Sequence, residues 1–261
     1  MNTEFKKEDS ALDKNYTART HYKGEVAKSY VLNRSSSLKW KTEQRIMNKI
    51  ISNLPKGSWI LDLPVGTGRL LPFYSEGNYP VYGMDISKDM LLESKESHKD
   101  MDNIKDFIEG NAEDIPLPDD SVDYVICLRL LNLVPLKVVE NIIKEFNRVS
   151  RKGVIVEVRV TEKLGRLSLI QKMLTDPRTH FNRLVYPYYS WSKNILSIIF
   201  GKKKEEEPIQ GSETYFLHEA DDFNRILSEV GLITKEVIEV DKGLDYKKRQ
   251  YKPLLIASLI K

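Results

Sequence analysis

The chain has 261 residues with 41 basic and 38 acidic side chains, and its formal net charge is +3. This length accommodates one sizeable core with additions. The near balance of charge carries no strong nucleic-acid signature, so no nucleic-acid partner is expected. The single cysteine excludes a disulfide within the chain, which suits a reducing compartment. No signal peptide is expected from the charged first residues, and no stretch approaches the roughly 18 to 20 apolar residues of a membrane span. We expect a cytoplasmic protein.

The first part of the chain is predicted to be a tail followed by helices. Residues 1–20 are polar and are predicted to be mobile. Residues 25–34 and 38–54 have the pattern of two helices, and the second ends before the helix-stopping segment 55–57. We assign 21–54 to N-terminal cap helices that cover one edge of the pocket predicted by the next segment.

The segment 59–69 has the pattern of a ligand-binding loop. An apolar strand ends in the carboxylate of Asp62, and Gly66 and Gly68 then allow a close approach of the backbone. A helix-compatible stretch begins near Arg69, so its positive N-terminus would point back at a bound ligand. The order strand, acid, glycines and helix therefore predicts a binding loop.

The next strand indicates which kind of ligand this loop binds. Residues 80–85 form an apolar run that ends in Asp85, 17 residues after Gly68. A carboxylate at that position can accept hydrogen bonds from both hydroxyls of a ribose, which favours a nucleoside cofactor. A dinucleotide site needs a third spaced glycine, and residues 69–72 contain none. We therefore disfavour a dinucleotide.

Residues 108–116 and 118–126 give a short strand, a polar turn and a fourth strand, so that three strand ends converge. With these residues in place, the chain resembles the class I S-adenosylmethionine-dependent methyltransferases over about 55–160. The segment 110–123 looks like the adenine-side turn of the small-molecule and lipid methyltransferases. The resemblance implies a fold, a cofactor and a set of contacts.

The resemblance implies that Asp62 lies beneath the methionine part of S-adenosylmethionine, and that Gly66 and Gly68 line the methionine and the ribose. It implies that Asp85 binds the ribose and that residues 111–112 meet the adenine. The full set of expected cofactor contacts is Asp62, Leu63, Pro64, Gly66, Gly68, Arg69, Asp85, Ile86, Met90, Asn111, Ala112, Glu113 and Cys127.

Two residues depart from the family pattern. Pro64 replaces the first loop glycine, which fixes φ and removes one backbone donor. Asn111 stands where an aspartate is common, although its side chain can still accept a hydrogen bond from the adenine amino group. These departures leave two alternatives to methyl transfer. One is a non-catalytic S-adenosylmethionine-binding regulatory protein, and the other is a different reaction in the same pocket, such as decarboxylation or cyclisation.

The later elements complete the expected fold. A helix is predicted over 136–149, a fifth strand over 153–158, a helix from 219 to about 231, and two closing strands over 233–240 and 253–260. We therefore expect an α/β, Rossmann-like, seven-stranded and mostly parallel sheet with helices on both faces. Its parts are a core at 55–160, a lid insertion after the fifth strand at 161–210, and a completion of the core at 211–261.

The acceptor is expected to meet the lid and the ends of the late strands, because ligands of open α/β sheets bind beyond the carboxyl ends of the strands. Tyr188 and Tyr189 of the aromatic lid are candidate contacts. The segment 186–204 is either a helix packed on the domain or an element for peripheral membrane contact. Arg129 and Arg159 could bridge an anion, unless Arg159 pairs with Glu157 or points outward.

Glu157 and His218 are the candidate bases for an acceptor that carries a hydroxyl or a protonated amine. A carboxylate acceptor would need no base. The segment 127–130 lacks the Asn-Pro-Pro-Tyr type motif, and the lone cysteine lacks a preceding proline. These absences disfavour base-amine, glutamine-amide and cytosine-carbon methylation. The sequence thus predicts in-line transfer of a methyl group to O, N or C of a small, anionic or amphiphilic acceptor. S-adenosylhomocysteine is the expected product, and no metal is expected.

Overall fold

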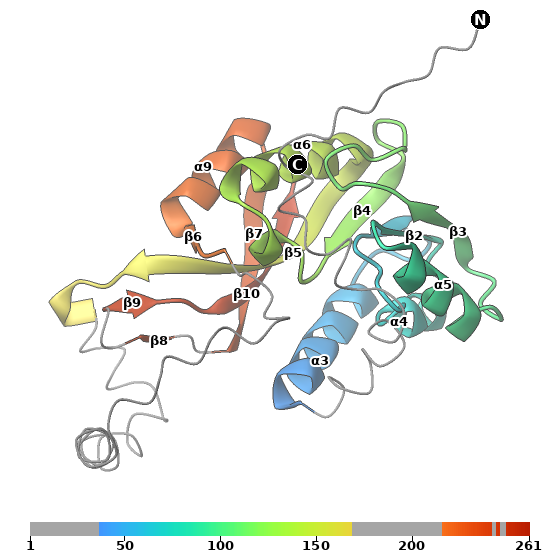
Figure 1. Cartoon of the computed structure of the whole chain (residues 1–261), viewed down its shortest axis with the longest axis horizontal. Coiled ribbons are helices and arrows are strands. Elements are labelled where there is room, and N and C mark those ends of the chain that lie inside the picture. The colour runs from blue at the N-terminus through green and yellow to red at the C-terminus, as the bar shows by residue number, and fades with distance from the viewer. Residues whose placement is uncertain (1–36, 169–215, 242–243, 246–248) are drawn as a thin grey trace, which may run out of the picture. The chain divides into compact units, whose positions relative to one another are not determined.

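The computed structural model describes residues 37–168, 216–241, 244–245 and 249–261 (Figure 1). The chain divides into two compact units. The described residues of the first are 37–161, 216–241 and 252–261, and those of the second are 162–168, 244–245 and 249–251. The predicted tail 1–20, the predicted helix 25–34 and most of the predicted lid 161–210 lie outside the described residues, so the predicted domain boundaries stay predictions.

The helices and strands of the first unit follow the predicted order. Local signals set the ends of several helices: the Ser37 Oγ accepts a hydrogen bond of 3.1 Å from the Trp40 amide at the start of α3, and Gly231 ends α9 with a φ of 78°. The elements are α3 (Leu38–Ser52), β1 (Ile60–Asp62), α4 (Leu71–Glu76), β2 (Val81–Asp85), α5 (Lys88–Ser97), β3 (Ile104–Glu109), β4 (Val122–Cys127), the 3₁₀ turn η1 (Leu131–Leu133), α6 (Leu136–Val149), β5 (Ser150–Lys163), β6 (His218–Glu219), α9 (Ala220–Val230), β7 (Ile233–Asp241) and β10 (Leu254–Ile260).

Seven strands form the main sheet in the order β3-β2-β1-β4-β5-β10-β7. The pairs among β3, β2, β1, β4 and β5 are parallel, whereas β10 runs antiparallel to both β5 and β7. The predicted Rossmann-like, mostly parallel sheet is therefore confirmed. Because the chain crosses from β3 at one edge back to β4 beside β1, the order reverses between β1 and β4, which is where ligands bind in such sheets.

Side chains of the central strands alternate between two apolar layers, as the two-residue period of a strand requires. Leu61, Cys127 and Val156 belong to the layer beneath α6 and α9. Ile126 and Ile155 belong to the opposite layer, beneath α3 and α4. In Figure 1 these two helix pairs lie on opposite sides of the strands. A side chain at a strand end therefore faces the α3 side or the α6 side according to its place in this alternation.

The described part of the second unit is a small antiparallel arrangement. The last two residues of β5, Glu162 and Lys163, pair with β9 (Gln250–Tyr251), which also pairs with β8 (Leu244–Asp245). The sequence did not predict these short strands. Among the described residues, no helix has both the length and the apolar character needed to cross a bilayer.

The close pairing of β5 with β10 makes Gly153 a sensitive position. A Cβ atom added there would overlap the carbonyl oxygen of Leu259. We expect Gly153→Ala to lower the free energy of unfolding by about 1 to 3 kcal/mol, because the strands must separate. Urea denaturation would measure the loss. Gly165→Ala is the matched control, since its added methyl would meet no atom within 4 Å, and an equal loss in both variants would contradict the assignment.

Candidate active site

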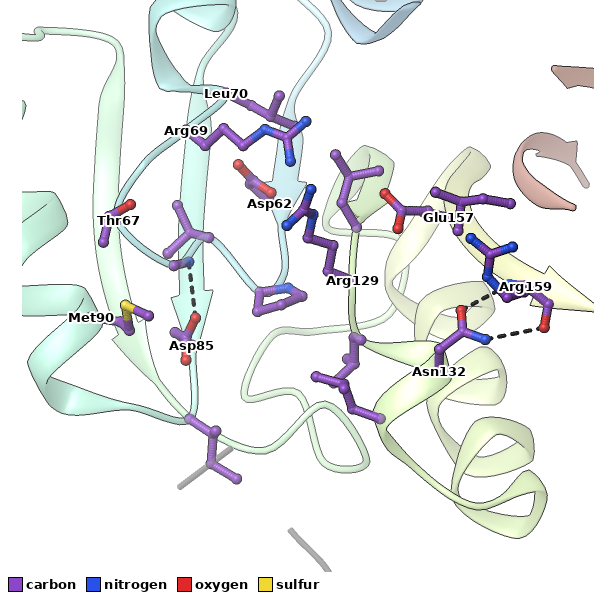
Figure 2. A pocket seen from close by; sticks show the side chains of 18 of the residues that line it. Asp62, Thr67, Arg69, Leu70, Asp85, Met90, Arg129, Asn132, Glu157 and Arg159 are labelled. Atoms are coloured by element: carbon purple, nitrogen blue, oxygen red, sulfur yellow. Dashed lines mark hydrogen bonds between the residues drawn. The ribbon is translucent and has the colours of Figure 1, made fainter. Parts of the chain in front are cut away.

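A cavity of about 360 Å³ lies in the first unit, at the carboxyl ends of β1, β2 and β4 and beside Glu157 and Arg159 of β5. Figure 2 shows Thr67, Asp85 and Met90 on one side of it, and Asn132, Glu157 and Arg159 on the other. The predicted site residues that line it are Asp62, Pro64, Gly66, Arg69, Asp85, Ile86, Met90, Arg129, Glu157 and Arg159. The strand-order reversal thus collects residues from distant parts of the sequence.

Asp85 organises one side of the cavity. Its Oδ2 accepts a hydrogen bond of 2.9 Å from the Gly66 amide, and its Oδ1 accepts one of 2.8 Å from the Ser87 amide (Figure 2). Burial raises the pKa of Asp85 to about 6, although these backbone amides oppose the rise. Each carboxylate oxygen retains a lone pair, so the side chain can accept further hydrogen bonds from a ligand.

The two loop glycines have different roles. A Cβ atom added at Gly66 would meet no atom within 4 Å, and Gly66 lines the cavity with a φ of 56°. A Cβ added at Gly68 would overlap the His98 ring and the Ser94 hydroxyl of α5. Gly68 is not a lining residue. Gly66 therefore leaves open space at the cavity wall, while Gly68 allows the loop to pack closely against α5.

Asp62 lies at the end of β1 and is only 3% exposed. Burial raises the pKa of Asp62 from its ordinary 3.8 to about 8; the Tyr74 hydroxyl and the Arg69 guanidinium oppose this rise, and the nearby Asp85 adds to it. Near neutral pH this carboxyl therefore holds a proton until a positive charge comes close to it.

Glu43 of α3 joins two arginines at the cavity. This side chain is fully buried, and its Oε2 lies 2.9 Å from the Arg69 Nη1 and 2.7 Å from the Arg129 Nη2. The Cζ atoms of Arg69 and Arg129 lie 4.0 Å and 5.2 Å from the centre of the Trp40 ring, a cation–π arrangement. The sequence analysis missed Glu43. Its signal was a charge within the buried stripe Trp40, Glu43, Met47 and Ile51 of an amphipathic helix.

Glu157 of β5 lies on the other side of the cavity and is 3% exposed. Burial, with a smaller contribution from Glu43, raises the pKa of Glu157 to about 7, against the opposing charges of Arg129, Lys39 and Arg69. Its Oε2 has no hydrogen-bond partner among the described residues. Such a carboxyl can gain or lose a proton near neutral pH.

The Arg159 guanidinium forms an ion pair and a hydrogen bond within the protein, but not with Glu157, which was one of the expected partners. Its Nη2 lies 2.8 Å from the Asp241 Oδ2 of β7, and its Nη1 donates to the Lys252 carbonyl. The Asn132 side chain accepts from the Arg159 amide at 2.8 Å and donates to the Arg159 carbonyl at 3.1 Å (Figure 2). Both predicted acceptor arginines line the cavity, and both are ion-paired within the chain.

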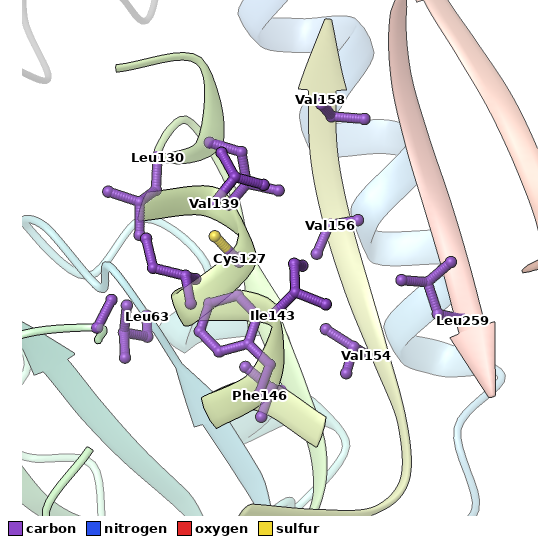
Figure 3. Packing of buried hydrophobic residues seen from close by; sticks show 14 of the residues in the cluster. Leu63, Cys127, Leu130, Val139, Ile143, Phe146, Val154, Val156, Val158 and Leu259 are labelled. Atoms are coloured by element: carbon purple, nitrogen blue, oxygen red, sulfur yellow. The ribbon is translucent and has the colours of Figure 1, made fainter. Parts of the chain in front are cut away.

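Leu63 and Cys127 were predicted to contact the cofactor, but neither lines the cavity. Both side chains belong to the apolar layer beneath α6, and Figure 3 shows Cys127 among Val139, Ile143 and other buried residues of that layer. The reason is strand alternation. Burial also raises the pKa of the Cys127 thiol well above its ordinary value, so the thiol stays protonated.

The remaining predicted residues lie elsewhere. Residues 111–113 do not line the cavity, and the Asn111 Oδ1 accepts a hydrogen bond of 3.1 Å from the Glu113 amide. The His218 Nε2 lies 2.7 Å from the Leu131 carbonyl oxygen, so it donates there, and His218 is not a lining residue. Tyr188 and Tyr189 lie outside the described residues. The roles proposed for these residues stay predictions.

Several lining residues were not predicted from the sequence. Most of them are apolar or uncharged, and such side chains carry no motif of their own. The loop after β1 contributes Val65, Thr67 and Leu70, the region after β4 contributes Leu128, Leu130, Asn132 and Leu133, and Lys39, Leu217 and Leu254 come from α3 and the late segments. Six of the lining residues are leucines, and one of them, Leu254 of β10, pairs with Arg159 of β5.

Comparison with known proteins identifies the family. Residues 60–153 match the family model described as "Methyltransferase domain". The chain is 30% identical over 200 residues to a demethylmenaquinone methyltransferase of Staphylococcus aureus, covering 76% of this chain and 77% of that protein. The chain belongs to the class I S-adenosylmethionine-dependent methyltransferases.

Other relatives agree with this assignment. The chain is 32% identical over 123 residues to a phosphatidylethanolamine N-methyltransferase of Cereibacter sphaeroides, which is 46% of this chain and 59% of that protein. The solved structure of a magnesium protoporphyrin IX methyltransferase from Synechocystis, with bound S-adenosylhomocysteine, shares the fold with a TM-score of 0.61 at 15% identity. That match covers 95% of this chain and 100% of the other.

The chain is thus an enzyme that transfers a methyl group from S-adenosylmethionine to a small-molecule acceptor, which argues against the non-catalytic, regulatory alternative. The cavity fits this cofactor. The Gly66 backbone is open to it, and the Thr67 Oγ1 is buried without a hydrogen-bond partner among the described residues. Two buried carboxyls, Asp62 and Asp85, suit a ligand that carries positive charges and ribose hydroxyls.

The raised pKa of Asp62 has a consequence for stability. A carboxyl whose pKa is higher in the folded state stabilises the fold most below its ordinary pKa of 3.8, and this contribution is lost as pH rises towards about 8. Asp62→Asn removes the charge. We expect the cofactor-free variant to match the wild type near pH 3 and to exceed its free energy of unfolding by about 2 kcal/mol or more near pH 9. Urea denaturation at both values measures this.

Asp123→Asn is the matched control with the opposite sign. The Asp123 carboxylate accepts from the Trp59 amide at 2.8 Å and contacts Arg151 and Lys152, and its pKa is lowered. A lowered pKa stabilises the fold above the ordinary value, and this contribution is lost as pH falls. This variant should therefore be less stable than the wild type at pH 9. Equal losses in both variants at that pH would contradict the assignment for Asp62.

Proposed function

We propose that this enzyme methylates an O, N or C atom of a small amphiphilic molecule whose proton is removed by Glu157. The observation that carries the proposal is the environment of Glu157, a carboxyl with a pKa near 7 in a cavity wall otherwise rich in leucine. A general base works best when its pKa lies near the working pH. The leucines offer an apolar surface for the rest of the acceptor.

Our proposal assigns the two sides of the cavity different roles. Asp62, Gly66, Asp85 and Met90 would hold S-adenosylmethionine, and Glu157 and the leucines would hold the acceptor. When bound, the cofactor supplies a methyl group on a positively charged sulfur. Arg129 lies between the two sides in Figure 2. In-line transfer requires the acceptor to approach from the Glu157 side, where exclusion of water would also favour loss of charge from sulfur.

The proton from the acceptor would move to the Glu157 carboxyl. An acceptor hydroxyl or amine becomes a nucleophile when its O–H or N–H bond breaks and the electron pair stays on the acceptor atom. Ionised Glu157 accepts this proton, and its burial stabilises the neutral acid that results. His218 is less suited to the role, because its Nε2 donates to the Leu131 carbonyl and it does not line the cavity.

We favour an amphiphilic acceptor over an anionic one. Arg129 is held by Glu43, and Arg159 is held by Asp241, so an acceptor anion would compete with a carboxylate of the protein for each guanidinium. The named substrates of the two relatives, phosphatidylethanolamine and demethylmenaquinone, also support a lipid-like acceptor. Peripheral membrane contact through 186–204 and the cytoplasmic location stay predictions.

Acceptor choice can be tested directly with the purified chain. We expect incubation with S-adenosylmethionine and either demethylmenaquinone or phosphatidylethanolamine, each in detergent micelles, to give a product heavier by one methyl group in mass spectrometry. A fatty acid in the same micelles serves as the anionic comparison. Turnover of the fatty acid alone would overturn the preference for an amphiphile without a net negative charge.

The role of Glu157 predicts a pH dependence. Because a base must be ionised, kcat/KM should rise with pH through about 7 and level off above it. Glu157→Gln should lower kcat by about 10² to 10⁴-fold and remove this rise. Calorimetry should show S-adenosylmethionine affinity close to that of the wild type. If His218→Gln removes the rise and Glu157→Gln keeps it, the base is His218.

A further inference from the structure

The ion cluster around Glu43 gathers charges from three segments of the chain. Glu43 belongs to α3, Arg69 to the loop after β1, and Arg129 follows β4. A third cation, the Lys39 Nζ, lies 3.7 Å from the Glu43 Oε1. One fully buried carboxylate therefore faces three cationic side chains. Removing one partner from a buried ion pair leaves an uncompensated buried charge, which is strongly destabilising, so these contacts are costly to break.

The same three cations act on Glu157. Arg129, Lys39 and Arg69 each lower the pKa of Glu157, whereas burial and Glu43 raise it. A guanidinium matches a carboxylate with two parallel hydrogen bonds, and its long side chain can turn towards a nearby one. An arginine that paired with Glu157 would hold the carboxylate ionised and occupy the oxygens that must receive a proton. The side chain of Glu157 would then be a poor base.

We propose that Glu43 is a positioning residue, which holds Arg69 and Arg129 against α3 and Trp40 and so prevents them from ion-pairing with Glu157. The distances support this, because Glu43 already takes Arg129 at 2.7 Å and Arg69 at 2.9 Å. Both guanidiniums also lie over the Trp40 ring of the same helix, within cation–π distance. The inference rests on the proposed role of Glu157 as the base.

The other charges near Glu157 come from each element that surrounds the cavity. The carboxyl of Asp62 on β1 is mostly protonated at neutral pH, since its pKa is about 8. Arg159 on the same strand as Glu157 is compensated by Asp241 of β7. The described charged and titratable groups around Glu157 and the cavity are thus Lys39 and Glu43 on α3, Asp62 and Arg69 from β1 and its loop, Asp85 on β2, Cys127 and Arg129 at and after the end of β4, Arg159 on β5 and Asp241 on β7.

Carboxyl-carbon NMR of the full chain tests the proposal without any ligand. Protein labelled with ¹³C at the glutamate carboxyl should show one resonance that titrates near pH 7, and this resonance should be missing in Glu157→Gln. In Glu43→Gln we expect its midpoint to fall by about 1 unit or more, because the repulsion from Glu43 is lost and the released arginines turn to Glu157. Adding Arg129→Gln isolates the second cause: the fall caused by Glu43→Gln should shrink in that background if Arg129 turns to Glu157, and stay unchanged if only the repulsion acts. In Arg129→Gln the midpoint should rise, since a cation that lowers this pKa is gone.

Opposite shifts from these two variants distinguish positioning from general damage to the fold. Glu140→Gln is the matched control, because Glu140 pairs with Lys137 and Lys144 on α6, away from the cavity lining. It should leave the midpoint unchanged. Glu43→Asp keeps the charge and should restore much of the wild-type midpoint. If Glu43→Gln fails to fold by circular dichroism, then Arg129→Gln and Glu43→Asp still decide the question.

The outcomes separate this inference from the proposed function. A midpoint that stays the same in Glu43→Gln, or that falls in Arg129→Gln, would overturn the positioning role while leaving Glu157 as the base. If the wild type transfers methyl groups but Glu157→Gln keeps the same pH profile, the proposed base is wrong. In that case the NMR shifts would still report whether Glu43 controls the arginines.

Discussion

The reversal of strand order between β1 and β4 is the constraint on which the site depends. Parallel strands present their carboxyl ends at one edge, and strand alternation sends every second side chain to the α3 side of that edge. Asp62, Asp85 and Glu157 share this side, whereas Leu63 and Cys127 do not. Convergence of three acids in one cavity is therefore a consequence of topology and a two-residue period, and the loops refine it.

Burial of these three acids affects both the stability of the fold and the chemistry of the cavity. Asp62, Asp85 and Glu157 have pKa values raised to about 8, 6 and 7, so the fold must tolerate groups that would ionise readily in water. The same desolvation makes Asp62 and Asp85 responsive to a cationic ligand and gives Glu157 the pKa near neutrality that its proposed role as a base requires. A cavity filled with apolar side chains would be more stable, but it would have neither property.

The sequence predicted the elements well and the side-chain directions less well. The acid-glycine loop and Asp85 carry local motifs, so β1, β2 and their ligand could be inferred from spacing. Cys127 was misassigned because its strand was predicted without knowing which face its last residue takes. Glu43 was missed because its partners, Arg69 and Arg129, are 26 and 86 residues away along the chain. Pairing over such separations depends on the whole sheet order, which no local pattern contains.

The placement of the arginines explains how one cavity can serve a cationic cofactor. Two or three unpaired guanidiniums beside the site would repel a sulfonium and attract anions, which would oppose binding of S-adenosylmethionine. Glu43 shares its single negative charge among Lys39, Arg69 and Arg129, and Asp241 pairs with Arg159, so the positive potential beside the cavity is lowered but not cancelled. The carboxyls of Asp62, Asp85 and Glu157 supply the negative charge that a sulfonium can meet. Selectivity for the cofactor therefore depends on how the protein neutralises its own arginines, as well as on the glycine loop.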